Sequence, residues 1–122
     1  DMQHFVFVTK WRKPFFSNDQ VRARAEQLIR HICELHHIEI LALGFDQAKP
    51  DHIHLMCIIP LSYKLSLAKA AQQIKWFSSI HLRKQFGWLR QDKYFWATHY
   101  FQKSIGGGRA AQQRYIERQG LR

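Results

Sequence analysis

The sequence His-Ile-His at positions 52–54 places two imidazoles two residues apart in a run that is otherwise apolar. If this run is a strand, His52 and His54 project from the same face of a sheet, because side chains alternate along a strand. Two neutral imidazoles side by side can bind a metal cation or a phosphate. Roughly every second chain of this composition would contain such a pair by chance, so the pair alone does not define a site.

A second candidate group lies in the segment RAAQQRYIERQ (109–119), for which we predict a helix. Tyr115 and Gln119 are four residues apart and therefore share one face of that helix. A tyrosine hydroxyl can attack phosphorus, and a carboxamide oxygen can complete the coordination of a metal beside two imidazoles. A packed tyrosine ring and a solvated glutamine are the alternative. The other tyrosines that could serve as a nucleophile are Tyr63, Tyr94 and Tyr100.

The strands that would position these residues follow from runs of β-branched, aromatic and alternating apolar side chains. We predict strands at 4–9, 38–45, 52–59 and 99–105. The second strand is apolar on nearly both faces, which favours a central place in the sheet. In the third strand, Leu55 and Cys57 point to the expected core, whereas Met56 lies with the two histidines on the outer face.

Three helices are predicted from apolar residues at alternating steps of three and four. The first runs from a cap among residues 17–19 to about residue 36, the second from the cap Ser66 to near Gly87, and the third over 109–119.

The order of these elements predicts an α+β fold for a single domain over residues 1–122. Strands and helices alternate as β-α-β-β-α-β, which is the pattern of a ferredoxin-like (RRM-like) sandwich with both helices on one face of the sheet. The extra C-terminal helix then lies across the other face and brings Tyr115 towards His52 and His54. Residues 88–98 are expected to form a loop before the last strand.

The chain carries 19 Lys and Arg against 9 Asp and Glu, which gives a net charge of +10. Such an excess indicates a polyanionic partner, with nucleic acid as the first candidate and an anionic membrane surface as the second. No apolar run approaches the ~18–20 residues that span a bilayer, and no signal peptide is visible. Cys33 and Cys57 lack CxxC spacing, so we expect buried free thiols in a reducing, cytoplasmic compartment.

The basic residues include two groups that suit a single-stranded nucleic acid. The first lies in the segment KWRKPFF (10–16), where bases can stack on Trp11, Phe15 and Phe16. The second extends the track along the second helix, and a solvated charged face is the alternative for each residue. The basic residues of the two groups are Lys10, Arg12 and Lys13, and Lys75, Arg83 and Lys84.

Four blocks of the sequence together resemble the small single-strand DNA transposases of bacterial and archaeal insertion sequences, which are HUH-type tyrosine enzymes. The blocks are FVTKWRKPFF, PDHIHLMCIIP, FWATHYFQKSIGG and RYIERQ, and they occur in this order over nearly the whole chain. By this resemblance, the segment 52–54 is the HUH motif, Tyr115 is the nucleophile and Gln119 is the third metal ligand. The transposases associated with repetitive extragenic palindromes share these motifs.

The resemblance implies cleavage and rejoining of single-stranded DNA through a 5′-phosphotyrosine intermediate, with a divalent metal ion, Mg or Mn, as cofactor. It also implies DNA hairpins at the ends of the element as substrate, and a homodimer. Because Gly106, Gly107 and Gly108 precede the last helix, we expect that helix to swing and the histidines of one subunit to work with the partner's Tyr115. The sequence opens at Asp1 without an initiating methionine, and we expect a short leader before it.

Other classes stay open on the residues alone. A non-catalytic nucleic-acid-binding module on the same scaffold would stack bases on aromatic side chains, without a metal or a covalent adduct. A two-histidine phosphoesterase requires two separated HxT or HxS motifs, but this sequence has one HxH pair followed by Leu55. Larger nickases with the same HUH chemistry need a longer chain.

Overall fold

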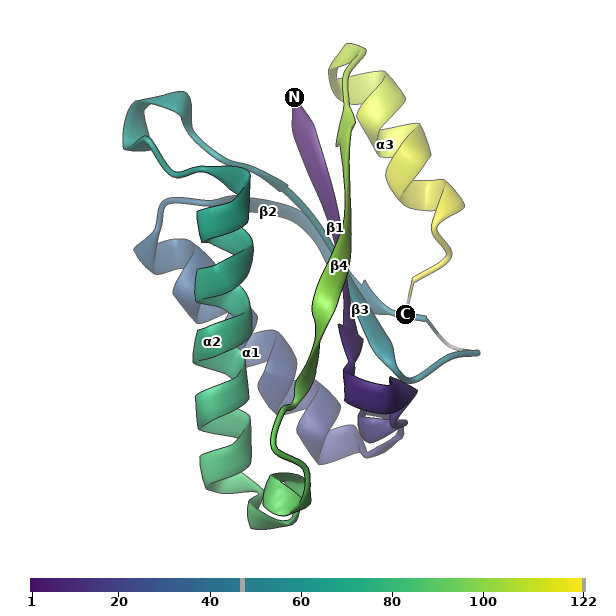
Figure 1. Ribbon diagram of the computed structural model, residues 1–122. Coiled ribbons are helices and arrows are strands. Elements are labelled where there is room, and N and C mark those ends of the chain that lie inside the picture. Colours follow the sequence, from purple (N-terminus) through teal and green to yellow (C-terminus); the bar gives the residue numbers. More distant parts are fainter. Residues whose placement is uncertain (47, 122) are drawn as a thin grey trace.

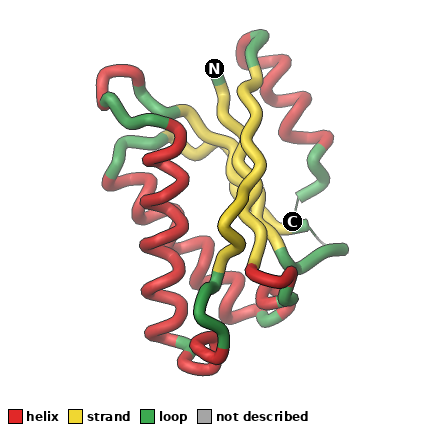
Figure 2. Tube along the Cα trace, in the orientation of Figure 1, coloured by secondary structure: helices red, strands yellow, loops and turns green. Residues whose placement is uncertain are grey.

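The computed structural model describes residues 1–46 and 48–121, which form a four-stranded antiparallel sheet with helices on both faces (Figures 1 and 2). The order β-α-β-β-α-β followed by a third helix confirms the predicted α+β ferredoxin-like fold. The strands are β1 Met2–Thr9, β2 Glu39–Phe45, β3 His52–Ile58 and β4 Trp96–Ile105, in the spatial order β2-β3-β1-β4. The helices are α1 Asp19–Leu35, α2 Leu67–Gln85 and α3 Gly108–Arg118.

The main core lies between the sheet and the helices α1 and α2, which cover the same face (Figure 1). Alternation along β1 sends Phe5 and Phe7 into this core, where both are fully buried. At the start of α1, the Asn18 side chain accepts hydrogen bonds of 3.0 Å from the backbone N–H groups of Gln20 and Val21. This cap satisfies two donors that the first turn of a helix otherwise leaves unpaired, so the predicted start of α1 is confirmed.

β4 begins at Trp96, three residues before the predicted strand at 99–105, so the end of the expected loop at 88–98 belongs to the strand. Burial explains the difference. Trp96 packs into the core, and its indole Nε1 donates a hydrogen bond of 3.0 Å to Ser78 Oγ on α2. Earlier in the expected loop, a short 3-10 helix covers Gly87–Gln91.

β2 lies at an edge of the sheet beside β3, which corrects the predicted central position. Ile40, Leu43 and Phe45 pack on the main core. A shift in register between Ile40 and Ala42 gives β2 a bulge, and Leu41 within it lines a cavity against α3. Because α3 lies on the other face of β2, this edge strand is apolar on both faces, as a central strand usually is.

α3 lies across the face of the sheet opposite α1 and α2, as the sequence predicts (Figure 1). Met2 and Met56 belong to this face by strand alternation, and both are fully buried, so the face is not open to solvent at these positions. Within Gly108–Arg118, all of which the structure describes, no residue is fully buried. The helix follows Gly107 (φ 87°) and begins at Gly108 (φ 77°), in the left-handed region that favours glycine. α3 is therefore attached through a glycine hinge and a lightly buried face.

Two further predictions concern the cysteines and the membrane. Cys33 and Cys57 are buried free thiols, as expected. Burial raises the pKa of both, that of Cys33 to about 12, which keeps them protonated and unreactive. Across residues 1–46 and 48–121, no helix is long and apolar enough to cross a bilayer.

Candidate active site

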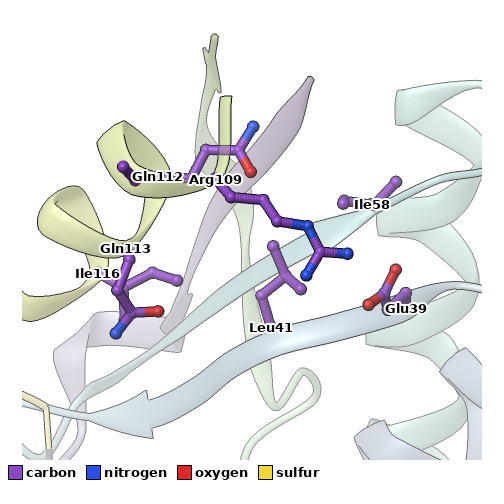
Figure 3. Close-up of a pocket in the computed structure, with 8 residues that line it drawn as sticks. Glu39, Leu41, Ile58, Arg109, Gln112, Gln113 and Ile116 are labelled. Carbon is purple, nitrogen blue, oxygen red and sulfur yellow. The ribbon is translucent and has the colours of Figure 1, made fainter. Parts of the chain in front are cut away.

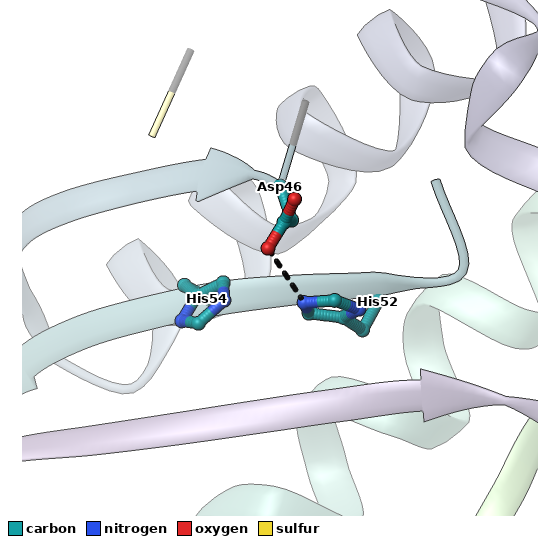
Figure 4. A group of neighbouring side chains, drawn as sticks. All are labelled: Asp46, His52 and His54. Carbon is teal, nitrogen blue, oxygen red and sulfur yellow. Dashed lines mark ion pairs between the residues drawn. The ribbon is translucent and has the colours of Figure 1, made fainter. Parts of the chain in front are cut away.

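His52 and His54 lie side by side on β3, on the face that α3 covers. Figure 4 shows them with Asp46, which directly follows β2, and the candidate ligand atoms of the three residues lie within 4.8 Å of one another. His52 Nε2 is 3.6 Å from Asp46 Oδ2. Two imidazoles and a carboxylate form a donor set that fits a divalent cation such as Mn²⁺.

Asp46 was not among the residues predicted from the sequence. The ladder between β2 and β3 pairs Phe45 with Ile53, so the next residue of the chain falls opposite His52. The backbone N–H of Ala48 donates to Asp46 Oδ1 at 2.8 Å and is the main cause that lowers the pKa of this carboxyl. The sequence did contain a signal for Asp46. It is an acidic residue directly after the predicted strand 38–45, which precedes the strand with the HxH pair.

Asp51 fixes the orientation of the His52 ring. Its Oδ1 lies 2.7 Å from His52 Nδ1. Because a carboxylate accepts, the ring proton sits on Nδ1 and the lone pair on Nε2, the atom that faces Asp46. Arg12 Nη1 lies 3.6 Å from Asp51 Oδ2, which ties the basic loop after β1 to the site. In this loop Trp11 (φ 59°) and Arg12 (φ 52°) adopt left-handed backbone that non-glycine residues rarely take, as is frequent near functional sites.

A third histidine, His4 on β1, joins the pair and connects it to α3. Its side chain is buried at 3% exposure, and its ring stacks on His54 with centroids 5.1 Å apart. His4 Nε2 lies 2.9 Å from His54 Nδ1, and His4 Nδ1 lies 2.5 Å from Tyr115 Oη. A single histidine on a first strand has no informative spacing, and its place beside β3 follows only from the sheet order, so no pattern in the sequence indicated it.

Burial keeps the imidazoles of His4 and His54 neutral near pH 7. It lowers the pKa of His54 to about 4, and the neighbouring His4 and His52 lower it further. Burial likewise lowers the pKa of His4, and Lys103 adds to the effect. A neutral imidazole offers the lone pair that a metal requires. Burial raises the pKa of Tyr115, so its hydroxyl carries its proton in the resting protein.

Tyr115 lies on α3 and reaches the histidine cluster through His4, close to the predicted His54. Gln119 caps the C-terminus of the same helix, and its Nε2 donates a hydrogen bond of 3.3 Å to the carbonyl oxygen of Tyr115. The side-chain amide of Gln119 is thus bonded to its own helix, and Asp46 is a further candidate for the third ligand.

The competing tyrosines occupy other surroundings. Tyr100 packs near Phe5 and Phe7 on the core side of the sheet, with ring centroids 6.0 and 5.9 Å away. Tyr94 is 53% exposed. The side chain of Tyr63 lies outside the described part of the chain. Among the tyrosine side chains that are described, Tyr115 is the one hydrogen-bonded to the histidine cluster.

Several residues of the predicted basic track are engaged within the fold. Lys75 Nζ donates to the carbonyl oxygen of Ala97 at 2.7 Å and links α2 to β4. Arg83 Nη2 donates to the carbonyl oxygen of Asp92 at 2.9 Å, and Lys13 Nζ lies 2.8 Å from the Asp92 carboxylate. The contacts to Asp92 join the loop before β4 to α2 and to the loop after β1, so these basic residues have structural roles as well.

The aromatic part of the predicted track is smaller than expected. Phe15 and Phe16 are buried at 8% and 0% exposure, which corrects the prediction that bases stack on them. The chain turns inward there through a short 3-10 helix and adds both rings to the core. Trp11 is 76% exposed, and Lys10 Nζ lies 5.0 Å from its ring centroid. Trp11 therefore remains as the stacking surface of this loop. Of the second basic group, Lys84 is exposed on the last turn of α2.

A cavity of about 400 Å³ lies between α3 and the strands β2 and β3, near the edge of the sheet that β2 forms (Figure 3). Figure 3 shows the Arg109 guanidinium pointing across it towards the Glu39 carboxylate. Leu41 and Ile116 add apolar surface to the lining. The cavity separates part of α3 from the sheet, which agrees with the absence of fully buried residues in Gly108–Arg118.

The fold and the site together define a class of protein, in which a ferredoxin-like sheet presents paired histidines to a tyrosine on a C-terminal helix. The sequence model of the family described as "Transposase IS200 like" matches residues 2–119, and the chain belongs to this family. The transposase for insertion sequence element IS200 of Salmonella typhimurium is 32% identical over 119 residues, which cover 95% of this chain and 74% of that protein. Its counterpart in Salmonella typhi gives the same values, 32% over 119 residues.

Solved structures support the fold. A crystal structure of a candidate transposase from Deinococcus radiodurans superimposes with a TM-score of 0.75 at 23% identity, covering 100% of this chain and 92% of that chain. A REP-associated tyrosine transposase, solved bound to a REP hairpin, superimposes with a TM-score of 0.61 at 16% identity, covering 96% of this chain and 61% of that chain. The family is thus established by sequence and its architecture by structure.

Proposed function

We propose that this transposase cleaves and rejoins single-stranded DNA through a covalent bond between Tyr115 and a 5′-phosphate. The observation that supports the proposal is the position of Tyr115 Oη, which lies 2.5 Å from His4 Nδ1 and is connected through the His4 ring to His54. A hydroxyl held next to candidate metal ligands is placed to attack a phosphate bound there.

We infer a divalent cation, Mg²⁺ or Mn²⁺, as the cofactor. His52 and His54 would hold it, together with either Asp46, which the structure places beside them, or Gln119, which the family resemblance implies. When bound, such a cation acts as a Lewis acid on the scissile phosphate and stabilises the charge that builds on it. The neutral imidazole of His54 and the ionised carboxylate of Asp46 match this demand without a prior change of protonation.

The chain's own residues account for the transfer. Tyr115 Oη forms a bond to phosphorus and loses its proton, while the bond from phosphorus to the 3′-oxygen breaks. The leaving oxygen takes up a proton, which yields a free 3′-hydroxyl and a 5′-phosphotyrosine. A different 3′-hydroxyl then attacks the phosphotyrosine, and Tyr115 regains its proton. Because a phosphodiester is exchanged for a phosphotyrosine, no nucleotide is needed to rejoin the ends.

We infer DNA hairpins at the ends of the element as the recognised feature, supported by the hairpin bound to the REP-associated relative. The exposed Trp11 and the cations Lys10, Arg12 and Lys84 offer a stacking ring and charges for the DNA backbone. We also infer a homodimer, as the family resemblance implies.

A denaturing gel tests the proposal. An oligonucleotide that carries one end of the element with its hairpin is labelled at its 5′ end in one sample and at its 3′ end in another. With Mn²⁺, the 3′-labelled fragment should migrate with the protein, because that fragment carries the 5′-phosphate, whereas the 5′ label should appear on a shorter free strand. Binding without an adduct in either sample would instead indicate a non-catalytic binding module.

A further inference from the structure

His4 is a buried polar residue whose two ring nitrogens are both engaged. It is 3% exposed, and its neighbours at hydrogen-bond distance are His54 Nδ1 at 2.9 Å and Tyr115 Oη at 2.5 Å. Buried polar groups are kept when they are fully hydrogen-bonded. The ring therefore forms a continuous path between a candidate metal ligand and the proposed nucleophile.

We propose that His4 is a positioning residue that couples the tautomer of His54 to the hydroxyl of Tyr115. The inference rests on the proposed roles of His54 and Tyr115. It follows from counting protons along the path, because a neutral imidazole has one protonated and one bare nitrogen.

When a cation is bound to His54, the hydrogen bonds along this path run in one direction, from His54 to Tyr115. Since His54 Nδ1 faces His4, the nitrogen left for a cation is Nε2, and the ring proton lies on Nδ1. That proton is donated to His4 Nε2, so the proton of His4 lies on Nδ1 and is donated to Tyr115 Oη. The tyrosine oxygen then accepts a hydrogen bond, and its own proton points away from His4 and is free to leave. A donor at this oxygen stabilises the negative charge that develops when the proton is lost.

Without the cation the path can run the other way. The Tyr115 hydroxyl donates to His4 Nδ1, His4 Nε2–H donates to His54 Nδ1, and the His54 proton lies on Nε2. In this arrangement the tyrosine proton is held by His4. The two arrangements contain the same three protons and the same net charge, so the change between them is a change of tautomer. His4 thus places the nucleophile in its reactive hydrogen-bonding state when the metal site is filled.

Nitrogen NMR of histidine-labelled protein tests this coupling without any reaction, because ring nitrogens with and without a proton differ strongly in chemical shift. Zn²⁺ serves as a diamagnetic probe, in the absence of DNA, and signals are assigned with His4→Gln and His54→Gln variants. We expect Zn²⁺ to place the protons of both His4 and His54 on Nδ1. Bound Zn²⁺ with the His4 proton on Nε2 would overturn the coupling and leave the metal site intact. No effect of Zn²⁺ on His52 and His54 would overturn the metal site and the coupling together.

Variants of His4 separate positioning from packing. His4→Phe keeps a ring of similar size but has no polar atoms, whereas His4→Gln can accept from His54 through its oxygen and donate to Tyr115 through its nitrogen. We expect His4→Phe to weaken Zn²⁺ binding ~10-fold or more, as for other partners of metal-bound histidines, and His4→Gln to recover part of the loss. The matched control is His31→Phe on the exposed side of α1, which should bind as the parent does.

A packing role for His4 predicts the opposite order, with phenylalanine better than glutamine in a buried position. Calorimetric titration with Zn²⁺, together with thermal unfolding of each variant, decides between the two. Equal Zn²⁺ affinity for His4→Phe and the parent protein would overturn the proposal. If His4→Phe does not fold, the nitrogen spectra of the parent protein still decide, because only a coupled path moves the His4 proton to Nδ1 when Zn²⁺ binds to His54.

Discussion

Three side chains lie close to the His54 ring. His4 is at hydrogen-bond distance from one nitrogen, the ring of His52 lies 5.1 Å away between centroids, and Asp46 offers a ligand atom within 4.8 Å. Burial holds the pKa of His54 at about 4, far below its ordinary value of 6.5. The cost of burying an uncharged imidazole is moderate, and the lone pair it keeps is the property that a metal site requires.

The lowered pKa of His54 predicts a pH dependence of stability in the metal-free protein. In the unfolded chain the imidazole titrates near 6.5, whereas in the folded chain its pKa is about 4. As the pH falls through this window, the unfolded state binds a proton that the folded state does not, so the free energy of unfolding decreases. Above about pH 6.5 both states are neutral and the contribution vanishes.

Urea unfolding between pH 4 and 7 measures this effect. The parent protein should lose stability on acidification more steeply than His54→Gln, which cannot titrate at this position. Parallel curves for the two proteins would show that His54 is not held neutral by the fold.

The identity of the third ligand is a second prediction at this scale. Asp46→Asn should weaken Mn²⁺ binding by ~10-fold or more, since loss of partners even outside the coordination sphere has effects of that size. Gln119→Ala should weaken it less, because water can replace an amide oxygen and the Gln119 amide is bonded to its own helix. Calorimetric titration with Mn²⁺ compares the two, and a larger loss in Gln119→Ala would assign the ligand to Gln119 instead.

Residue patterns reveal this site only in part, for physical reasons. The pairing of His52 with His54 depends on alternation within one strand, which is local and readable. His4 and Asp46 join them through the neighbours of β3 in the sheet, and strand order is a non-local property. Asp46 at the end of β2 could have been found from the register of a hairpin, but His4 required the complete sheet.

Among the elements, α3 sets the position of Tyr115 relative to the sheet. The helix follows Gly107 and Gly108, both with left-handed backbone, and none of its described residues in Gly108–Arg118 is fully buried. The cavity of about 400 Å³ on one side of α3 also lowers its packing against the sheet. The position of α3 therefore depends on few contacts, among them the hydrogen bond between Tyr115 and His4.

Alanine substitutions in the hinge should have unequal effects on the reaction. Each places a side chain in left-handed backbone, at a cost of ~1–2 kcal/mol. At Gly107 a new Cβ would also lie 3.1 Å from Ala111 Cβ, whereas at Gly108 no atom lies within 4 Å. We expect Gly107→Ala to displace α3 and slow adduct formation more than Gly108→Ala.

Single-turnover rates of adduct formation compare these variants, with thermal unfolding as the control. The unfolding temperature should fall by a similar, modest amount in both, since both substitutions place a side chain in left-handed backbone and the main core does not include α3. A slower Gly108→Ala than Gly107→Ala would mean that contact with Ala111 does not hold the hinge in place.

The elements themselves were predictable where their signals are local. Asn18 and Ser66, both expected as caps, accept the hydrogen bonds that begin α1 and α2. The start of β4 and the edge position of β2 were predicted wrongly. Trp96 joins its strand because its indole is bonded to α2, and β2 is apolar on its second side because α3 lies there. Both depend on tertiary neighbours that no short window of sequence contains.

At the scale of the whole molecule, the structure places Tyr115 beside the histidines of its own chain. The glycine hinge and the lightly packed α3 also permit the exchange that the family resemblance implies, in which α3 serves the sheet of a partner subunit. We propose that the enzyme acts as a homodimer with such sharing.

Mixing two inactive variants tests the exchange. Tyr115→Phe protein retains both site histidines, and His54→Ala protein retains Tyr115. If α3 is exchanged, a mixed dimer contains one complete site, so cleavage should return to about a quarter of the parent rate when half of the dimers are mixed and each has one of two sites. Continued inactivity, with subunit exchange confirmed by tags on the two variants, would show that each chain builds its own site.

Mass spectrometry tests the role of Tyr115 directly, because it locates the residue of the protein to which the DNA is joined. After reaction with Mn²⁺ and nuclease treatment, trypsin should release residues 115–118 as one peptide, because it cleaves after Arg114 and after Arg118. We expect this peptide to carry a nucleotide joined through the 5′-phosphate to Tyr115, and we expect Tyr115→Phe protein to bind the same DNA but to yield no modified peptide. A nucleotide found on a peptide that contains Tyr63, Tyr94 or Tyr100, or an adduct that persists in Tyr115→Phe, would contradict it.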